Sequence, residues 1–118
     1  MKKRTNPDFL NGVPELVILR LLAAQPMHGY EIVQGIRTAT GQTLDFGEGC
    51  VYPILHRLEA SRLLTSRREV VNGRSRVVYR VTEKGRKKLE ESVSLWRQIV
   101  KAVDLVLQGG LHVEPATA

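Results

Sequence analysis

Basic side chains are concentrated in one stretch of the chain, from Arg62 to Lys88. This stretch holds ten arginines and lysines and only two acidic residues, Glu69 and Glu83, in a chain whose formal net charge is +6. Guanidinium and ammonium groups bind phosphate oxygens, so a local excess of this size is typical of a surface that binds a polyanion. A solvated basic surface without a partner is the alternative interpretation.

A β-hairpin is predicted at the centre of this basic stretch. Residues 64–71 and 74–81 are rich in β-branched side chains, and the dipeptide Asn72-Gly73 separates them. Asn-Gly suits a two-residue hairpin turn because both turn positions need a positive φ. The sequence therefore predicts two antiparallel strands joined by a tight turn, with arginines along both strands.

Four of these arginines are candidates for binding DNA phosphates. Arg74 and Arg76 lie next to the turn and are the strongest candidates. Arg67 and Arg68 are adjacent, and successive side chains of a strand point to opposite faces, so only one of them can face DNA. In the second strand, one predicted face carries Val77, Tyr79 and Val81, and the other carries Arg76, Val78 and Arg80.

A helix that begins near Gly47 or Glu48 is predicted immediately before the hairpin. Its apolar residues recur at intervals of three and four, which indicates one buried face; they are Val51, Ile54, Leu55 and Leu58. Pro53 lies inside this helix, where its ring would clash with the carbonyl of Gly49. Because glycine has no Cβ, we expect the pair to be tolerated as a bent or loosened first turn.

Three residues of this helix are candidates for facing a DNA groove: Cys50, Tyr52 and His56. Tyr52 can donate to a phosphate or be a half-buried packing residue. His56 can bind a base edge or phosphate, or be a neutral surface histidine. Cys50 can be a small apolar residue or a redox switch.

Two further residues have a DNA-binding and a structural interpretation. Arg57 either contacts a phosphate or pairs with a carboxylate such as Glu59 or Glu31. Tyr30 either lies near the DNA backbone or serves in packing. The residue patterns leave both choices open.

Two helices are predicted before this element. The first, from about Pro14 to Ala24, is apolar on most sides, as expected for a central helix. The second begins at His28-Gly29-Tyr30 and extends to about Thr40. Gly35 within it lowers helix propensity by about 1 kcal/mol relative to alanine, which favours a close helix crossing there.

A long helix is predicted from the Thr82 cap to about Gln108, before Gly109-Gly110. Its apolar residues are spaced by 4, 3, 4, 3 and 4 positions, a coiled-coil seam made of Leu89, Val93, Trp96, Val100, Val103 and Leu107. A helix of about 26 residues is about 39 Å long, which is more than so small a domain can cover. We therefore expect a second copy of the chain to pack on this seam, rather than a helix that folds back on its own domain.

The remaining features bound the class of protein. The single cysteine excludes an intrachain disulfide, no His or Cys cluster has metal-ligand spacing, and no apolar run reaches the length of a membrane span. The histidines are not paired with carboxylates at metal-ligand spacings, and no nucleophile or phosphate-loop motif is present, which argues against an enzyme. We expect a cytoplasmic protein without cofactors.

The order of elements predicts a mainly α fold with a small β-hairpin: a winged helix-turn-helix domain followed by a long dimerisation helix. We expect a flexible basic arm at 1–12, the winged domain at 13–82, the dimerisation helix at 83–108 and a disordered tail at 109–118. In such folds the third helix enters the major groove and the hairpin contacts phosphates.

Three motifs resemble the PadR family of bacterial transcriptional regulators in its short form. Residues 28–32 (HGYEI) resemble the family's second-helix signature, and residues 49–59 (GCVYPILHRLE) resemble its recognition-helix pattern G-x-x-Y-P-x-L-x-R-L-E. Residues 73–76 and 79–85 (YRVTEKG) resemble its wing. The departures are Gly47 in place of a better cap, Cys50 in place of threonine, Ser75 in place of proline, and Val77 and Val78 in place of more polar or aromatic residues.

The resemblance implies a homodimeric repressor that binds double-stranded operator DNA and is often released by a small molecule. Some members of the family bind flat aromatic compounds at the dimer interface, and Trp96 on the seam could stack on such a ligand. Trp96 could instead only fill the dimer core. A winged-helix module that binds proteins and not DNA is the alternative function, and the MarR family is the alternative regulator family.

Overall fold

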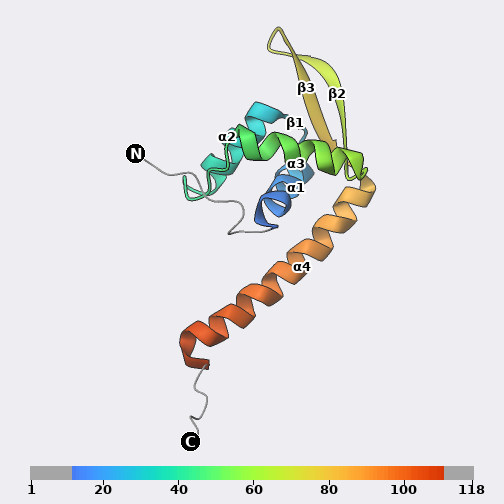
Figure 1. Ribbon diagram of the computed structural model, residues 1–118. Coiled ribbons are helices and arrows are strands. Elements are labelled where there is room, and N and C mark those ends of the chain that lie inside the picture. Colours follow the sequence, from blue (N-terminus) through green and yellow to red (C-terminus); the bar gives the residue numbers. More distant parts are fainter. Residues whose placement is uncertain (1–11, 111–118) are drawn as a thin grey trace, which may run out of the picture.

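The computed structural model of the protein describes residues 12–110 (Figure 1). The predicted arm, except Gly12, and the predicted tail after Gly110 lie outside the described residues. The elements follow the order α1 (Val13–Ala24), β1 (Met27–His28), α2 (Gly29–Ala39), α3 (Glu48–Ala60), β2 (Leu64–Val71), β3 (Arg74–Val81) and α4 (Glu83–Leu105). A wider π-helical turn, Val106–Gly110, ends the described part. The predicted fold class is confirmed.

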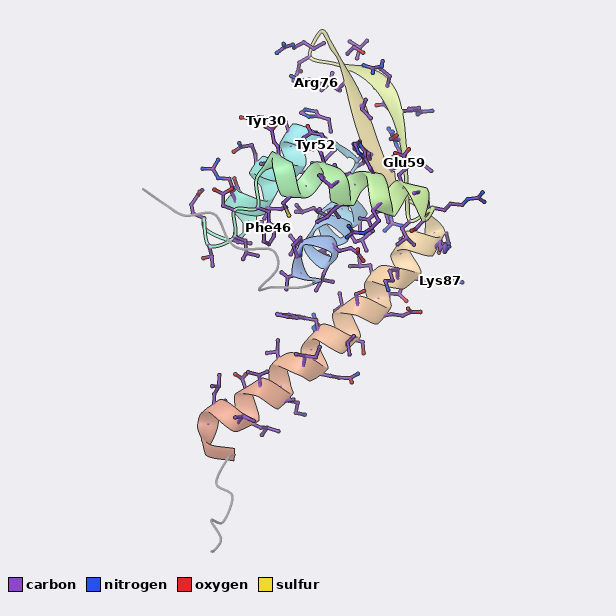
Figure 2. The ribbon with its side chains drawn as sticks, viewed as in Figure 1. Tyr30, Phe46, Tyr52, Glu59, Arg76 and Lys87 are labelled. Atoms are coloured by element: carbon purple, nitrogen blue, oxygen red, sulfur yellow. The ribbon has the colours of Figure 1, made fainter. Side chains whose placement is uncertain are left out.

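One apolar core lies between α1, α2, α3 and the base of the hairpin. Its most deeply buried side chains are Ile18, Leu19, Leu22, Ile32, Ile36, Val51, Leu55, Leu58 and Leu64. The apolar faces predicted for the first three helices are therefore the faces that pack together. Phe46, in the connector between α2 and α3, is also buried in this core (Figure 2).

The sheet has a third strand that the periodicity did not predict. β3 is central, with β2 on one side and β1 on the other, and β1 pairs Met27 with Tyr79 and His28 with Val78. A strand of two residues is too short to produce an alternating pattern. His28 is both the last residue of β1 and the N-cap of α2, so α2 begins one residue later than expected. The His28 N–H donates to Glu31 Oε1 at 3.0 Å.

The predicted hairpin is confirmed in its bounds and its turn. The strands pair from Leu64 with Val81 to Val71 with Arg74, and φ is 52° at Asn72 and 77° at Gly73. Its base is attached to the helices, because Leu64 and Tyr79 are buried and Ser66 Oγ donates to Glu59 Oε2 of α3 at 2.6 Å. The hairpin tip extends away from the core (Figure 1).

α4 begins on the domain and then leaves it (Figure 1). Thr82 caps it as predicted, with its hydroxyl accepting the Gly85 N–H at 3.0 Å. Leu89 is buried in the domain core, whereas every described residue from Ser94 onward is exposed. The α-helix ends at Leu105, three residues before the predicted end, where the wider turn begins. None of the helices within residues 12–110 combines the length and apolar character that a membrane crossing needs.

Two glycines test how closely the elements approach one another. A Cβ added at Gly85 would overlap the carbonyl oxygen of Leu63 and lie 2.7 Å from Val81 Cγ2. At Gly35 an added Cβ would lie 3.4 Å from Leu21 Cδ1, an ordinary contact. The close crossing expected at Gly35 is therefore absent, and the tight contact lies where α4 begins.

We predict that Gly85→Ala destabilises the domain while Gly35→Ala does not. The backbone carbonyl of Leu63 cannot rotate away from an added methyl group, and overpacking of this kind costs about 1–3 kcal/mol. In the control, Gly35→Ala, the better helix propensity of alanine favours neutrality or a small gain. Thermal unfolding followed by circular dichroism measures both. Equal melting temperatures for the two variants would contradict the prediction.

Candidate nucleic-acid interface

The solvent-facing side of α3 is made by Gly49, Pro53 and His56, which are all exposed. Tyr52 and Glu59 are half-buried on the flank that faces the hairpin, whereas Cys50 lies on the opposite flank with Arg57. The helix begins after Gly47, whose φ of 74° and ψ of 168° favour glycine. Gly47 is therefore suited to this position by its backbone, although, as expected of a weaker cap, it supplies no side-chain hydrogen bond to the start of α3.

A concave surface lies between α3, the start of α2 and the hairpin; we call it the wing cleft. Its volume is about 340 Å³, and its lining residues are His28, Gly29, Tyr30, Tyr52, His56, Arg68, Ser75, Arg76, Val77 and Tyr79. Five of the nine predicted DNA-binding residues therefore lie together in it. In Figure 2, Tyr30 and Tyr52 lie below Arg76, which projects from the hairpin on their side.

Tyr52 packs against the start of α2, as its structural interpretation expected, and its contact with a phosphate stays a prediction. It is half-buried, and its ring and hydroxyl lie so close to Gly29 that a Cβ there would overlap them. Its hydroxyl also lines the wing cleft at the start of α2. Tyr30 is 52% exposed, so packing does not account for its position. Behind them, burial raises the pKa of the Tyr79 hydroxyl, and the Glu59 and Tyr52 charges add to that effect.

The two adjacent arginines of β2 face opposite sides of the hairpin. Arg68 lines the wing cleft and donates to Ser75 Oγ at 3.3 Å. Arg67 pairs with Glu69, with 3.2 Å between Nε and Oε2. Within residues 12–110, Arg68, Arg74 and Arg76 form no ion pair with a carboxylate. These three guanidinium groups are therefore the ones available to phosphates, with Arg74 exposed beside the turn.

Arg57 and Cys50 border a different cleft, of about 920 Å³, between α1, α2 and the start of α3. Arg57 Nη2 lies 3.1 Å from Glu15 Oε2 of α1, so the partners expected from the sequence, Glu59 and Glu31, were wrong. A pair between residues so far apart in the chain has no local sequence signal. Burial raises the pKa of the Cys50 thiol, with Arg57 opposing the shift, and a protonated thiol is a poor redox switch.

A second, apolar cleft lies between α1 and α4; we call it the α4 cleft. It measures about 740 Å³ and is lined by Leu16, Val17, Leu21, Val93, Trp96, Val100 and Leu105 together with the polar Arg20, Arg97, Lys101, Asp104 and Gln108. Trp96 is 42% exposed, and Val103 beside the cleft is also exposed. Leu89, predicted as an interface residue, is instead buried in its own domain because α4 still packs there.

Sequence reasoning missed part of the wing cleft. His28, Gly29, Ser75, Val77 and Tyr79 line it, although only their neighbours had been proposed. His28 and Gly29 belong to the HGYEI motif, which was the signal available for them. Glu69 was also passed over, because a lone acidic residue in a basic hairpin has no pattern of its own.

Comparisons with known proteins agree with this geometry. The profile of the "Transcriptional regulator PadR-like family" matches residues 18–91. Transcriptional regulator Rv3488 of Mycobacterium tuberculosis is 35% identical over 96 residues, which cover 81% of this chain and 87% of the relative.

Two solved structures extend the comparison to the fold. A PadR-like regulator from Bacillus cereus is 29% identical with a TM-score of 0.76, covering 86% of this chain and 98% of that one. Bacillus subtilis PadR, solved in complex with operator DNA, is 24% identical with a TM-score of 0.63, covering 70% of this chain and 47% of that one. The short-form resemblance and the expectation of a regulator rather than an enzyme are therefore confirmed. This chain belongs to the PadR-like family of transcriptional regulators.

Proposed function

We propose that the chain is a homodimeric repressor that binds double-stranded operator DNA through the wing cleft and is released by a small aromatic or other hydrophobic ligand. The observation that carries the proposal is the wing cleft itself. It has two arginines without carboxylate partners on the hairpin side, and Tyr52 and His56 on the α3 side. Because operator DNA lies in the bacterial cytoplasm, the proposed repressor acts there.

The two walls of the wing cleft suit different parts of a duplex. The exposed side of α3 enters the major groove, where base edges differ in their donors and acceptors, and His56 is its exposed polar side chain nearest the hairpin. Arg68, Arg74 and Arg76 bind phosphates and thereby fix the position of α3. Tyr30 and Tyr52 contact the backbone beside the start of α2. That Bacillus subtilis PadR was solved with operator DNA supports double-stranded DNA as the partner.

α4 supplies the contact between two copies. Its outer half and the π-helical turn after it expose apolar side chains, namely Leu95, Trp96, Ile99, Val100, Val103, Leu105, Val106 and Leu107. A patch of this kind marks an interaction site because water solvates it poorly. A second copy that packs on Val93, Trp96, Val100 and Val103 covers the patch and holds two wing clefts against two half-sites.

The α4 cleft is the proposed ligand site. Its walls are mainly apolar, and Trp96 presents a flat indole surface at its edge. A planar aromatic ligand gains stacking energy there in addition to burial. A ligand that separates or reorients the two α4 helices changes the spacing of the wing clefts and releases the operator. This is the step that makes the repressor responsive.

The first prediction compares two neighbouring arginines on opposite faces. We expect Arg68→Gln to weaken binding to a duplex from the chain's own promoter region about 10-fold, with a salt slope shallower by about 2 per dimer, because each copy loses a phosphate contact. We expect Arg67→Gln to change little, since Arg67 is paired with Glu69. Fluorescence anisotropy between 50 and 200 mM salt (about the range in which such contacts are resolved) measures both. Equal losses would contradict the assignment of faces.

The second prediction concerns the dimer. We expect the protein to sediment as a dimer and Val103→Glu to sediment as a folded monomer, because a carboxylate on the seam cannot be buried without a partner. Gln98→Glu introduces the same charge on an exposed residue off the seam and should stay dimeric. Analytical ultracentrifugation with circular dichroism makes the comparison. A dimeric Val103→Glu variant would exclude this seam.

The third prediction uses Trp96 as its own probe, since it is the chain's single tryptophan. We expect a planar aromatic dye to quench its fluorescence and to lower promoter affinity at the same concentrations. Trp96→Leu should keep the dimer but lose the response to the dye. If Trp96 only fills the dimer core, the dye will leave both the fluorescence and the promoter affinity unchanged.

A further inference from the structure

Glu69 is the one acidic residue in the two hairpin strands, which carry five arginines. Its Oε2 atom lies 2.6 Å from Arg80 Nη1 and 3.2 Å from Arg67 Nε. One carboxylate thus holds a guanidinium group from its own strand and another from the neighbouring strand. The hydrogen bond from Arg80 lowers the pKa of the Glu69 carboxyl the most, and the hydrogen bond from Arg67 lowers it further. Together they hold this pKa below its ordinary value.

The three paired residues lie on the side of the hairpin away from the wing cleft. Arg67 and Glu69 are two residues apart in β2 and share a face, and Arg80 is opposite Thr65 on that same face. Arg68 has the opposite orientation and lines the wing cleft. Arg76 is opposite Glu69 in the register and starts from that same face, but it forms no ion pair with Glu69 and its residue lines the wing cleft. Glu69 therefore divides the hairpin arginines into a paired group, Arg67 and Arg80, and an unpaired group, Arg68, Arg74 and Arg76.

Such a pairing does little for folding. Arg67 is largely exposed, with 73% of its side chain accessible, and exposed ion pairs contribute little to stability because water screens them. The effect on DNA binding is larger, because non-specific binding depends almost entirely on the number of phosphates that cations neutralise. A hairpin with five unpaired arginines would bind any duplex from either face.

We propose that Glu69 is a specificity-determining residue that withholds Arg67 and Arg80 from phosphates and so weakens binding to non-operator DNA more than binding to the operator. The inference rests on the proposed DNA binding through the wing cleft. On the operator, α3 fixes the register and the wing cleft faces the duplex, so Arg67 and Arg80, which do not line the cleft, contribute little. On other DNA no register is fixed, and the outer face can approach phosphates as readily as the cleft.

The test is Glu69→Gln, which keeps the shape of the side chain and removes its charge. We expect affinity for a scrambled duplex to rise about 3- to 10-fold, with a salt slope steeper by about 1 to 2 per protomer. Affinity for the promoter duplex should rise less, so the ratio between the two duplexes falls. Fluorescence anisotropy titrations of both duplexes at several salt concentrations give the affinity and the salt slope for each duplex.

Two controls separate pairing from simple charge. Glu91→Gln makes the same change of net charge at an exposed residue of α4, remote from the hairpin, and should leave the ratio unchanged. In the Arg67→Gln/Arg80→Gln background, Glu69→Gln should raise scrambled binding no more than Glu91→Gln does, because no withheld arginine remains to be released. A gain that appears only when Arg67 and Arg80 are present is the result expected if Glu69 withholds these two arginines from phosphates.

The outcomes distinguish this inference from the proposed function. If the protein prefers its promoter duplex but Glu69→Gln behaves like Glu91→Gln, or raises both affinities equally, the inference alone is overturned. It is also overturned if, in the Arg67→Gln/Arg80→Gln background, Glu69→Gln still raises scrambled binding by more than Glu91→Gln does, because the gain then does not come from these two arginines. If the protein binds neither duplex and Glu69→Gln is equally inactive, both proposals fail.

Discussion

The attachment of the hairpin base to the helical core is the constraint on which the rest of the structure depends. Leu64 and Tyr79 are buried at the base, and full burial of side chains of this size contributes about 1.5–3 kcal/mol each. The Ser66–Glu59 hydrogen bond and the pairing of β1 with β3 fix the orientation of the hairpin relative to the helices. A free two-stranded hairpin is marginally stable in water, so these contacts determine where its arginines lie relative to α3.

With the base attached, the period of two along a strand separates the charges of the hairpin. Arg68 reaches the wing cleft, whereas Arg67 reaches the outer face, where Glu69 pairs it together with Arg80. Net charge alone would treat all these arginines as one basic surface. Their faces give them different partners, and this difference is the physical basis of the proposed distinction between operator affinity and general affinity for DNA.

The same domain also sets the direction of α4. Thr82 and Gly85 bring the start of α4 against the Leu63 carbonyl, and Leu89 holds the first turns on the core. Beyond Val93 α4 diverges from the domain, with the α4 cleft between them, and its apolar side chains are exposed (Figure 1). A change in how two α4 helices pack would therefore be transmitted to the wing clefts through a rigid helix start.

The sequence by itself determined the elements whose signals are local. The Asn72-Gly73 turn needs positive φ, Thr82 offers a capping hydroxyl, and the apolar periods of the helices identify their buried faces, so these predictions were confirmed. The family motifs likewise identified the regulator class, and the motifs together with the basic hairpin pointed to five residues of the wing cleft. Only the tertiary structure decided the contacts between segments that are distant in the chain. These are the pairing of strand β1, the Arg57–Glu15 pair, and which of Arg67 and Arg68 lines the wing cleft. Such contacts depend on how packed elements are oriented, and no short-range pattern encodes that orientation.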